Sequence, residues 1–316
     1  MNSTLLYTNT EKRTSLDLSI VIPTYKRAKY LCDSLESIKM QQAGHSVRFE
    51  VVVVNNDPTA DMEDIIEKYA DLPISFYRNV ENYGQVGNVN LGAMLARGRY
   101  ICYLHDDDLL LPGYLRTVEK FLQRDFPCIL PEYMDFEAEY HFDWKHWLLR
   151  WLSCFRVLYK GEIQKIDPNF YKNTFYNVYD APTCGVLFLK QALEEFGFFR
   201  DERGASWDYY NLRHFNETQA VYMLHRCIGA RRRDSGMSNT QKVQEEFRQD
   251  ATLLREELAE WPFVKRYGDC ILTHRPLWKF AVYRVVQDAR IYLNNMERHR
   301  PIKRHEHRWI RKYFTL

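Results

Sequence analysis

Strand-like and helix-like segments alternate through roughly the first 125 residues of the chain. The predicted strands, which are apolar and rich in β-branched residues, are residues 16–23, 49–54, 74–78, 99–104 and 128–130. The predicted helices, recognised by their apolar spacing, are residues 27–41, 61–69, 87–96 and 112–123. This alternation is the signature of a parallel sheet with crossover helices. We therefore expect an α/β fold in which helices flank a mostly parallel central sheet.

Three clusters of polar residues stand directly after predicted strands, at residues 24–27, 55–57 and 105–108. In open α/β sheets, ligands bind at the carboxyl ends of the strands. The third cluster contains three consecutive carboxylates, Asp106 to Asp108, which repel one another and stabilise a fold poorly. Such oxygen ligands suit Mg²⁺ or Mn²⁺, which can in turn hold a diphosphate. The alternative is a solvated acidic turn that caps the next helix.

The pattern changes after Asp135, although composition still favours one large domain with an appendage. Hydrophobic residues make up 46% of the 316 residues, enough for a sizeable core. Residues 142–158 are rich in Trp and Leu and predict a helix packed on the core, with a helix facing an acceptor or a membrane as the alternative. The further predicted elements are a strand at 181–188, a helix at 190–196, an apolar segment at 220–227 and helices from 241 onward.

We expect a catalytic domain at residues 16–240 and a helical, basic C-terminal extension at residues 241–316. Within the domain, residues 16–125 form a nucleotide-binding half and residues 126–240 an acceptor half. Residues 275–316 carry 11 Lys and Arg against 3 Asp and Glu, whereas the preceding residues carry 33 against 39. A basic tail next to a mildly acidic body favours peripheral contact with an anionic membrane, worth ~1 kcal/mol per basic residue near the surface. The alternative is a tail helix packed on the domain or in a dimer, and nucleic acid is not an expected partner.

Cysteine usage and the N-terminus favour a cytoplasmic location, with the inner face of the membrane as the place of any peripheral contact. The seven cysteines are scattered singly without a Cys-x-x-Cys pair, which indicates buried thiols in a reducing compartment and no zinc site. Residues 1–13 lack the apolar core of a signal peptide, and no run of ~18 apolar residues predicts a membrane span.

Four sequence blocks resemble one known family. They are Ser-Ile-Val-Ile-Pro-Thr-Tyr-Lys-Arg at 19–27, the strand at 51–54 with its polar end, Asn82-x-Gly84 continuing to Asn90 and Gly92, and Gly-Arg-Tyr-Ile at 98–101 leading into the aspartates and Pro112. Their order and spacing over residues 16–123 resemble the family 2 glycosyltransferases. That resemblance implies the GT-A fold and, in most members, a nucleotide-diphosphate sugar donor and inversion of the anomeric centre. A weaker downstream match lies at residues 185–188 and 196–199.

The resemblance also implies roles for individual residues. Asp208 falls where the family places its catalytic carboxylate, and the aspartates would hold Mn²⁺ or Mg²⁺ through Asp106 and Asp108. The residues expected to bind the donor are Pro23, Thr24, Tyr25, Arg27, Asn56, Asp57, Asn82, Gly84, Asn90, Asp106 and Asp107, with Arg233 and Ser235 from a late basic segment that would close over the diphosphate.

The chain departs from the family pattern at several positions, which leaves alternatives open. Asn55-Asn56 stands where many members have an Asp-Asp pair, so either Asn56 or Asp57 reads the nucleobase. His105 replaces a frequent acidic residue, and which aspartate touches the metal is open. Asn88-Val89 replaces a common Ala-Arg, so the arginine that neutralises the phosphates comes from elsewhere. Asp208 has the alternative role of a helix N-cap, and residues 231–233 that of a solvated basic turn.

The function expected from these features is transfer of a sugar, with UDP as the family's commonest nucleotide, to a hydroxyl of a glycan or lipid-linked acceptor in bacterial surface polysaccharide synthesis. The metal would offset charge on the leaving diphosphate. Asp208 would accept the proton of the attacking hydroxyl, a contribution of ~10²–10⁴-fold. The alternatives are a sugar-phosphate nucleotidyltransferase, whose glycine-rich loop is replaced here by Pro-Thr-Tyr, and a non-catalytic nucleotide-sugar-binding module.

Overall fold

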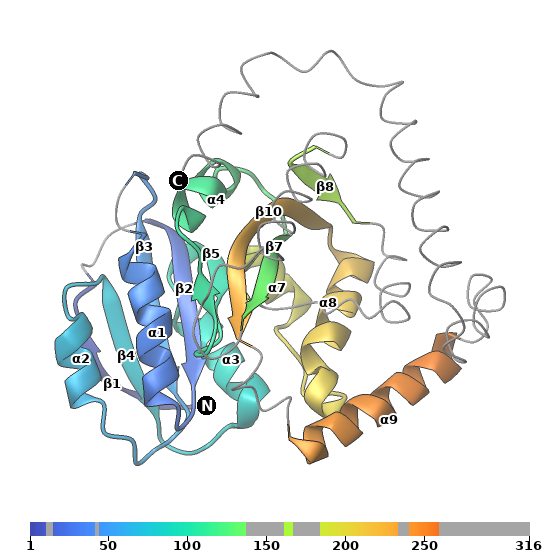
Figure 1. The fold of residues 1–316 in the computed structure, drawn as a ribbon, viewed down its shortest axis with the longest axis horizontal. Helices are drawn as coiled ribbons and strands as arrows, with labels where there is room; N and C mark the ends of the chain where they lie inside the picture. Colours follow the sequence, from blue (N-terminus) through green and yellow to red (C-terminus); the bar gives the residue numbers. More distant parts are fainter. Residues whose placement is uncertain (11–14, 42–43, 137–160, 167–183, 233–239, 259–316) are drawn as a thin grey trace.

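The computed structural model describes residues 1–10, 15–41, 44–136, 161–166, 184–232 and 240–258. These residues form one mixed sheet with helices on both faces (Figure 1). The strands are β1 Ser3–Thr8, β2 Leu16–Thr24, β3 Phe49–Asn55, β4 Ile74–Asn79, β5 Gly98–Tyr103, β6 Leu109–Leu110, β7 Cys128–Phe136, β8 Ile163–Lys165, β9 Val186–Leu189 and β10 Val221–Arg232. The helices are α1 Ala28–Lys39, α2 Glu63–Tyr69, α3 Gly84–Leu95, α4 Tyr114–Leu122, α7 Lys190–Phe196, α8 Trp207–Thr218 and α9 Gln241–Leu258, with a 3₁₀ turn η1 at Gly204–Ser206.

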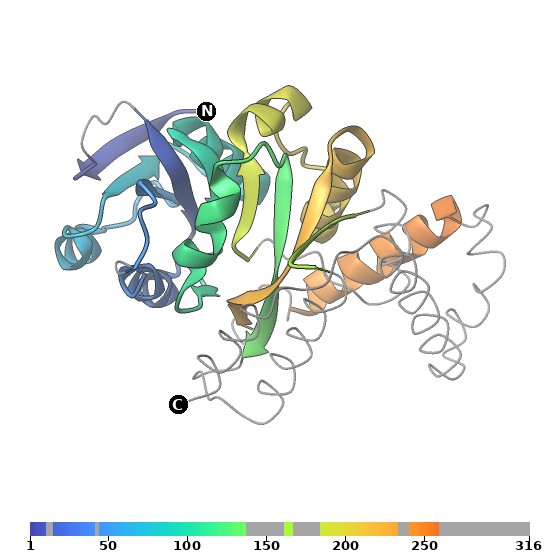
Figure 2. The same ribbon diagram turned by 90° about the horizontal axis from the view of Figure 1, so that it is seen from above.

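The strand order is β1-β4-β3-β2-β5-β9-β7-β10-β6, and β8 pairs with β10 beside this path. Strands β4, β3, β2 and β5 are parallel, as the alternation of strands and helices predicts. Strand β9 is antiparallel to both β5 and β7 and so joins the two predicted halves of the domain. Seen from above, the sheet crosses the molecule from β1 and β4 to β7 and β10, and α9 lies beyond it (Figure 2).

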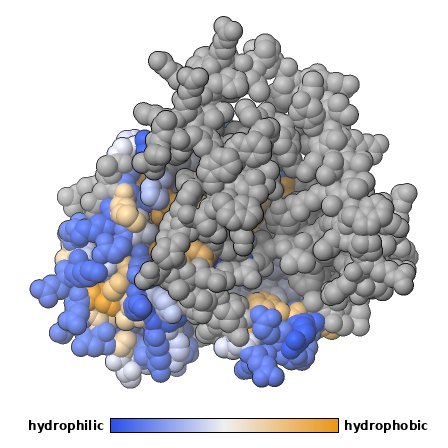
Figure 3. All heavy atoms as spheres, in the orientation of Figure 1, coloured by the Kyte–Doolittle hydropathy of each residue, from blue (hydrophilic) through white to orange (hydrophobic). Residues whose placement is uncertain are grey.

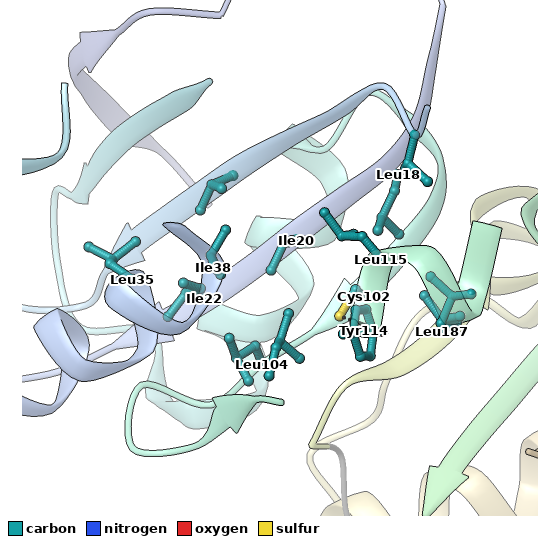
Figure 4. Close-up of a cluster of buried hydrophobic side chains, with 14 of the residues drawn as sticks. Leu18, Ile20, Ile22, Leu35, Ile38, Cys102, Leu104, Tyr114, Leu115 and Leu187 are labelled. Atoms are coloured by element: carbon teal, nitrogen blue, oxygen red, sulfur yellow. Dashed lines mark hydrogen bonds between the residues drawn. The ribbon is translucent and has the colours of Figure 1, made fainter. Parts of the chain in front are cut away.

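The twofold period of β2 divides its side chains between two hydrophobic cores. Leu18, Ile20 and Ile22 pack with α1 and α4 on one face of the sheet (Figure 4). Val21 joins the other core, which α3, α7 and α8 cover. All of these β2 side chains are fully buried, and burying one such aliphatic side chain is worth ~1.5–3 kcal/mol. Because both faces are covered, the strand is almost continuously apolar.

Several boundaries differ from those expected. Helix α3 begins at Gly84 rather than residue 87, and Gly84 itself has the left-handed φ of +71° that glycine adopts readily. Helix α4 begins at Tyr114, after Gly113 in the left-handed region, instead of at Pro112. Strands β1, β6 and β8 were not predicted, since they are short or polar and are defined by their pairing partners. The prediction for residues 190–196 is confirmed without change.

The two predicted halves share one sheet instead of forming separate layers. Residues Leu109–Leu110 of the first half pair with Gly229 and Ala230 of β10. The extension begins with α9, where Glu246 approaches Gly204 of η1. The surface on the side of α2 is mostly hydrophilic, with scattered hydrophobic residues (Figure 3). Within the described ranges, no helix combines the length and apolarity that crossing a bilayer requires. The Trp-rich segment at 142–158 and the basic tail lie outside those ranges.

Candidate functional site

Three parallel strands end side by side at one edge of the sheet. Strand β2 ends at Thr24, β3 at Asn55 and β5 at Tyr103. Thr24 and Asn55 are register partners, and the N–H of Asn56 donates to the carbonyl oxygen of Thr24 over 2.9 Å. The polar clusters that follow these strands therefore meet at this edge, as the sequence predicts.

Residues 105–108, which we call the acid turn, are bonded directly to the end of β2. The hydroxyl of Thr24 donates to Asp106 Oδ2 over 2.7 Å. The guanidinium of Arg27 bridges two carboxylates: Nη1 donates to Asp106 Oδ1 over 2.9 Å, and Nη2 to Asp107 Oδ2 over 2.7 Å. Only 5% and 9% of the two aspartate side chains are exposed, against 21% for Arg27. A cation of the chain itself thus lies between the carboxylates.

A second arginine holds the acid turn from the opposite side. The backbone N–H of Arg232, the last residue of β10, donates to Asp108 Oδ1 over 3.1 Å. Its Nε donates to the carbonyl oxygen of Asp107 over 3.3 Å, and its Nη2 to Asp33 of α1 over 2.7 Å. Strand β10 and helix α1 are thereby tied to the turn between them.

Sequence reasoning missed several residues of this arrangement. The guanidinium of Arg232 packs over the rings of Tyr30 and Phe136, with centroid distances of 5.1 and 4.6 Å. Ser34, which is fully buried on α1, donates to a carbonyl oxygen of the acid turn over 2.7 Å. Arg232 belongs to an arginine run that the sequence singles out, but Asp33 and Ser34 look like ordinary polar positions of a helix. Only the packing of α1 against the turn gives them a role.

Burial weakens the tendency of the acid turn to carry its full negative charge. It raises the pKa of Asp106 to about 6, although the neighbouring guanidinium of Arg27 acts in the opposite direction. Burial, together with the negative charge of Asp107, raises the pKa of Asp108 well above its usual value. Burial also lowers the pKa of His105. Three adjacent buried carboxylates are thus tolerated because protein cations and proton uptake offset their repulsion.

Asp106 and Asp108, the residues expected to hold a metal ion, are bonded to different protein groups in this structure. Both oxygens of Asp106 accept hydrogen bonds from the β2 side, whereas Asp108 is bonded to β10 and lies beside the thiol of Cys184. Among the described residues, no three or more His, Cys, Asp or Glu side chains are grouped so that they could hold a metal. The two carboxylates thus accept from different protein donors, and their role as metal ligands stays a prediction.

The second polar cluster builds a network of asparagine side chains. Asn56 Nδ2 donates to Asn82 Oδ1 over 2.8 Å and to the carbonyl oxygen of Gly84 over 2.9 Å. Its Oδ1 accepts from Asn79 Nδ2 over 2.8 Å and from the N–H of Tyr83 over 2.9 Å. The amide of Asn56 is 4% exposed and has donors and acceptors satisfied on both atoms. Asn56 therefore braces the loop that leads into α3.

Asn88, the first residue of the Asn88-Val89 pair that replaces the family's common Ala-Arg, extends the same network. Its Oδ1 accepts from Asn79 Nδ2 over 2.9 Å, and its Nδ2 donates to the carbonyl oxygen of Val54 over 3.0 Å. A buried amide at this position holds the end of β3 in place. Positive charge near the site comes instead from Arg27 and Arg232.

Asp57, which is 9% exposed, and the more exposed Tyr25 are the remaining predicted polar and aromatic residues of this edge. Asp57 Oδ1 accepts from the hydroxyl and N–H of Thr59 over 2.8 and 3.0 Å, and these bonds lower the pKa of the carboxyl. The ring of Tyr25 is 40% exposed, and Lys26 Nζ lies 5.2 Å from its centroid. Pro23, the residue before Thr24, is half-buried. An ionised acceptor and an exposed aromatic face therefore stand at neighbouring strand ends.

Two further predicted residues, Asn90 and Asp208, form hydrogen bonds at other places in the fold. The amide of Asn90 forms two hydrogen bonds with the backbone of Phe199, at 2.7 and 3.0 Å, and so links α3 to the acceptor half. Asp208 is the second residue of α8 and is half-buried, with its Oδ1 accepting from the N–H of Tyr209 over 2.8 Å. The N-cap of α8 is Ser206, so the alternative role of Asp208 as N-cap is wrong. Arg233 and Ser235 lie outside the described residues.

Comparisons with known proteins place the chain among glycosyltransferases. A sequence model described as glycosyl transferase family 2 matches residues 19–197, more than half of the chain. The uncharacterized glycosyltransferase YwdF of Bacillus subtilis (strain 168) is 33% identical over 125 residues, 39% of this chain and 45% of that protein. Minor teichoic acid biosynthesis protein GgaB of the same bacterium is 34% identical over 113 residues, 35% of this chain and 12% of that protein.

Solved structures confirm the expected fold. S. aureus TarS 1–349 in complex with UDP-GlcNAc has a TM-score of 0.54 at 18% identity, covering 81% of this chain and 70% of that one. The GT-A fold expected from the sequence is therefore confirmed. The chain spans about half the length of the first curated relatives that it matches, 45% and 57%.

Proposed function

The chain belongs to glycosyl transferase family 2, and from this premise we propose that it transfers a sugar from a nucleotide-diphosphate sugar, with UDP as the nucleotide, to a hydroxyl of a glycan or lipid-linked acceptor. The observation that carries the proposal is the direct bonding of Thr24 and Arg27 to the acid turn at the ends of β2 and β5. Ligands of open α/β sheets bind at this edge.

The base and ribose of the donor would lie over the ends of β2 and β3. Tyr25 offers an exposed aromatic face for the base, and Asp57 offers an ionised acceptor for a ring N–H. Asn56 is less suited to reading the base, because its amide is already bonded on both atoms. We therefore assign base recognition to Asp57, with Asn82 and Gly84 shaping the loop beside it.

The diphosphate would lie near the acid turn, where Arg27 is the described cation with partial exposure. Its guanidinium can offset the charge that develops on the leaving diphosphate, which is stabilisation directed at the transition state. Arg233 and Ser235 remain proposed contributors from the segment that follows β10.

Asp208 is proposed as the general base on the acceptor side. It would take the proton of the attacking hydroxyl as that oxygen bonds to the anomeric carbon and the bond to the leaving phosphate oxygen breaks. A single displacement of this kind inverts the anomeric centre and needs no carboxylate nucleophile. The similarity to a teichoic acid biosynthesis protein supports a bacterial surface polymer as the setting.

The test is calorimetric titration of the protein with UDP, GDP and dTDP, each with and without Mn²⁺. We expect one nucleotide to bind and the Asp106→Ala and Asp108→Ala variants to lose that binding. Asp125→Ala is the matched control, because Asp125 lies after α4 with 83% of its side chain exposed. If no nucleotide binds under either condition, the donor site is refuted and the non-catalytic alternative stands.

A further inference from the structure

The guanidinium of Arg27 occupies the part of the acid turn where a divalent cation would find paired carboxylates. It bonds Asp106 Oδ1 at 2.9 Å and Asp107 Oδ2 at 2.7 Å. We propose that Arg27 and a divalent metal ion compete for these two carboxylates, so that the arginine keeps the pair closed to metal until a diphosphate draws it away. The competition between Arg27 and metal concerns this chain alone. The release of Arg27 by a diphosphate rests on the proposed function.

The competition follows from distance and burial. Mg²⁺ binds carboxylate oxygens at ~2.0–2.1 Å. A metal on Asp106 Oδ1 would therefore lie at most about 5 Å from Arg27 Nη1, which is 2.9 Å from the same oxygen. The two carboxylates are at least nine-tenths buried, so water screens the repulsion between metal and guanidinium weakly. The two cations cannot share the pair without a large cost.

Arg27 is also placed so that it can leave the carboxylates. Its side chain is 21% exposed, whereas the side chain of the second arginine, Arg232, is only 6% exposed, bonds Asp33 and lies over the rings of Tyr30 and Phe136. Arg27 lies over the ring of Tyr30 at 5.3 Å, a contact that a rotated guanidinium can keep. A diphosphate offers a bidentate, doubly charged partner that suits the guanidinium fork.

The first experiment measures binding of Mn²⁺ alone, by electron paramagnetic resonance of the free ion, at pH 7.5 and without nucleotide. We expect weak binding to the unmodified protein and at least tenfold tighter binding to Arg27→Met, which corresponds to ~1.4 kcal/mol. Arg27→Lys keeps the positive charge but loses the forked guanidinium. Its Mn²⁺ affinity should fall between those of the unmodified protein and Arg27→Met. Circular dichroism establishes that each variant is folded.

Arg48→Met is the matched control. Arg48 bonds Asp17 through Nη2 at 2.9 Å and Nε at 3.2 Å, at the opposite edge of the sheet. Its loss removes the same charge but should leave Mn²⁺ affinity within twofold of the unmodified protein. An unchanged or lower affinity in Arg27→Met, or an equal gain in Arg48→Met, would overturn the proposal.

Repeating the titration with UDP separates this proposal from the proposed function. We expect UDP to raise Mn²⁺ affinity in the unmodified protein and to do so much less in Arg27→Met, where the competitor is already gone. UDP binding without any effect of Arg27→Met on metal affinity refutes the competition but keeps the donor site. A gain in metal affinity in Arg27→Met without UDP binding in any variant refutes the donor site but keeps the competition.

Discussion

The edge of the sheet at the ends of β2, β3 and β5, where we propose that the donor binds and which we call the donor edge, is held together by other contacts than the region around α8. At the donor edge, hydrogen bonds between side chains join β2, β3, β5 and α1, as in the contacts of Thr24 and Arg27 with the acid turn. Around α8, aromatic rings provide the cohesion. Phe215 contacts the rings of Phe188 and Phe196 with centroid distances of 5.3 and 5.2 Å.

The difference has a functional consequence. Hydrogen bonds are directional and fix atoms within tenths of an ångström, so they suit a site that recognises one constant chemical group. Aromatic packing is less directional and tolerates changes at neighbouring exposed positions. We infer that the donor edge holds its side chains in one fixed geometry. Around α8, the aromatic core supports Asp208, while the exposed residues near it can vary to suit different acceptors.

The largest expected effect is that of Asp208→Asn on catalysis. Loss of a general base should lower the rate of sugar transfer by ~10²–10⁴-fold. Because Asp208 lies on α8, where its Oδ1 accepts from the N–H of Tyr209, and is proposed to act on the acceptor, UDP affinity should change less than twofold. Steady-state kinetics and calorimetry measure the two quantities. A parallel loss of UDP binding would show that Asp208 takes part in donor binding. It would contradict the division of roles between the donor edge and the α8 region.

Phe215→Ala should have the largest effect on stability. Phe215 is fully buried, and removing such a ring costs ~3–5 kcal/mol. Denaturant unfolding measures this loss, and Leu5→Ala, at a side chain in β1 that is 47% exposed, should cost less than about 0.5 kcal/mol. UDP affinity, measured where the variant is still folded, should stay unchanged. Loss of both properties would mean that the two regions are not energetically separate.

Asn56→Ala should lower both the unfolding stability and the UDP affinity. The loss of stability should be smaller than that of Phe215→Ala. The variant removes the side-chain acceptor of the Tyr83 N–H and one of the two donors to Asn82 Oδ1, which still accepts from the N–H of Gly84. Loss of these bonds should cost ~1–3 kcal/mol. The loop would loosen and UDP affinity would fall with it. Asp57→Asn is the comparison variant, which should weaken UDP binding by about tenfold while unfolding stability changes by less than ~0.5 kcal/mol. The reverse result would make Asn56 the reader of the base.

The smallest expected effect concerns Glu162, which links α4 to β10 by charge. Arg226 Nε donates to Glu162 Oε1 over 2.8 Å, and Lys120 bonds the other oxygen. Burial opposes ionisation of Glu162, but its two cationic partners lower the pKa of the carboxyl below its ordinary value of 4.5. The stabilisation is therefore present above pH 4.5 and is lost as the pH falls through the lowered pKa.

Glu162→Gln should accordingly be less stable than the unmodified protein by ~0.5–1 kcal/mol at pH 7. The difference should shrink as the pH falls below 4.5, as measured by urea unfolding across this range. A difference that is independent of pH would show that the contact acts through packing and not through charge.

Much of the fold could be predicted because its signals are local. The apolar runs that become β2, β3 and β5, and the helical spacing of α1 and α7, are properties of short windows of sequence. Strands β6 and β8 could not be predicted in this way, since Leu109–Leu110 and Ile163–Lys165 are strands only because β10 lies beside them. The start of α3 was missed because Gly84 reads as a loop residue until its backbone is seen to open the helix.

By itself, the sequence determined the α/β architecture and the edge of the sheet at which the three polar clusters meet. Polar residues directly follow the apolar run of each of these strands, and parallel pairing brings the ends of the strands together. Only the tertiary structure decided how the polar residues at that edge divide their roles. Arg27 reaches Asp106 across 79 residues, and Arg232 reaches Asp33 across 199. Periodic burial is a local property of a strand or helix, whereas the partner of a buried charge depends on which distant segments the completed sheet places beside it.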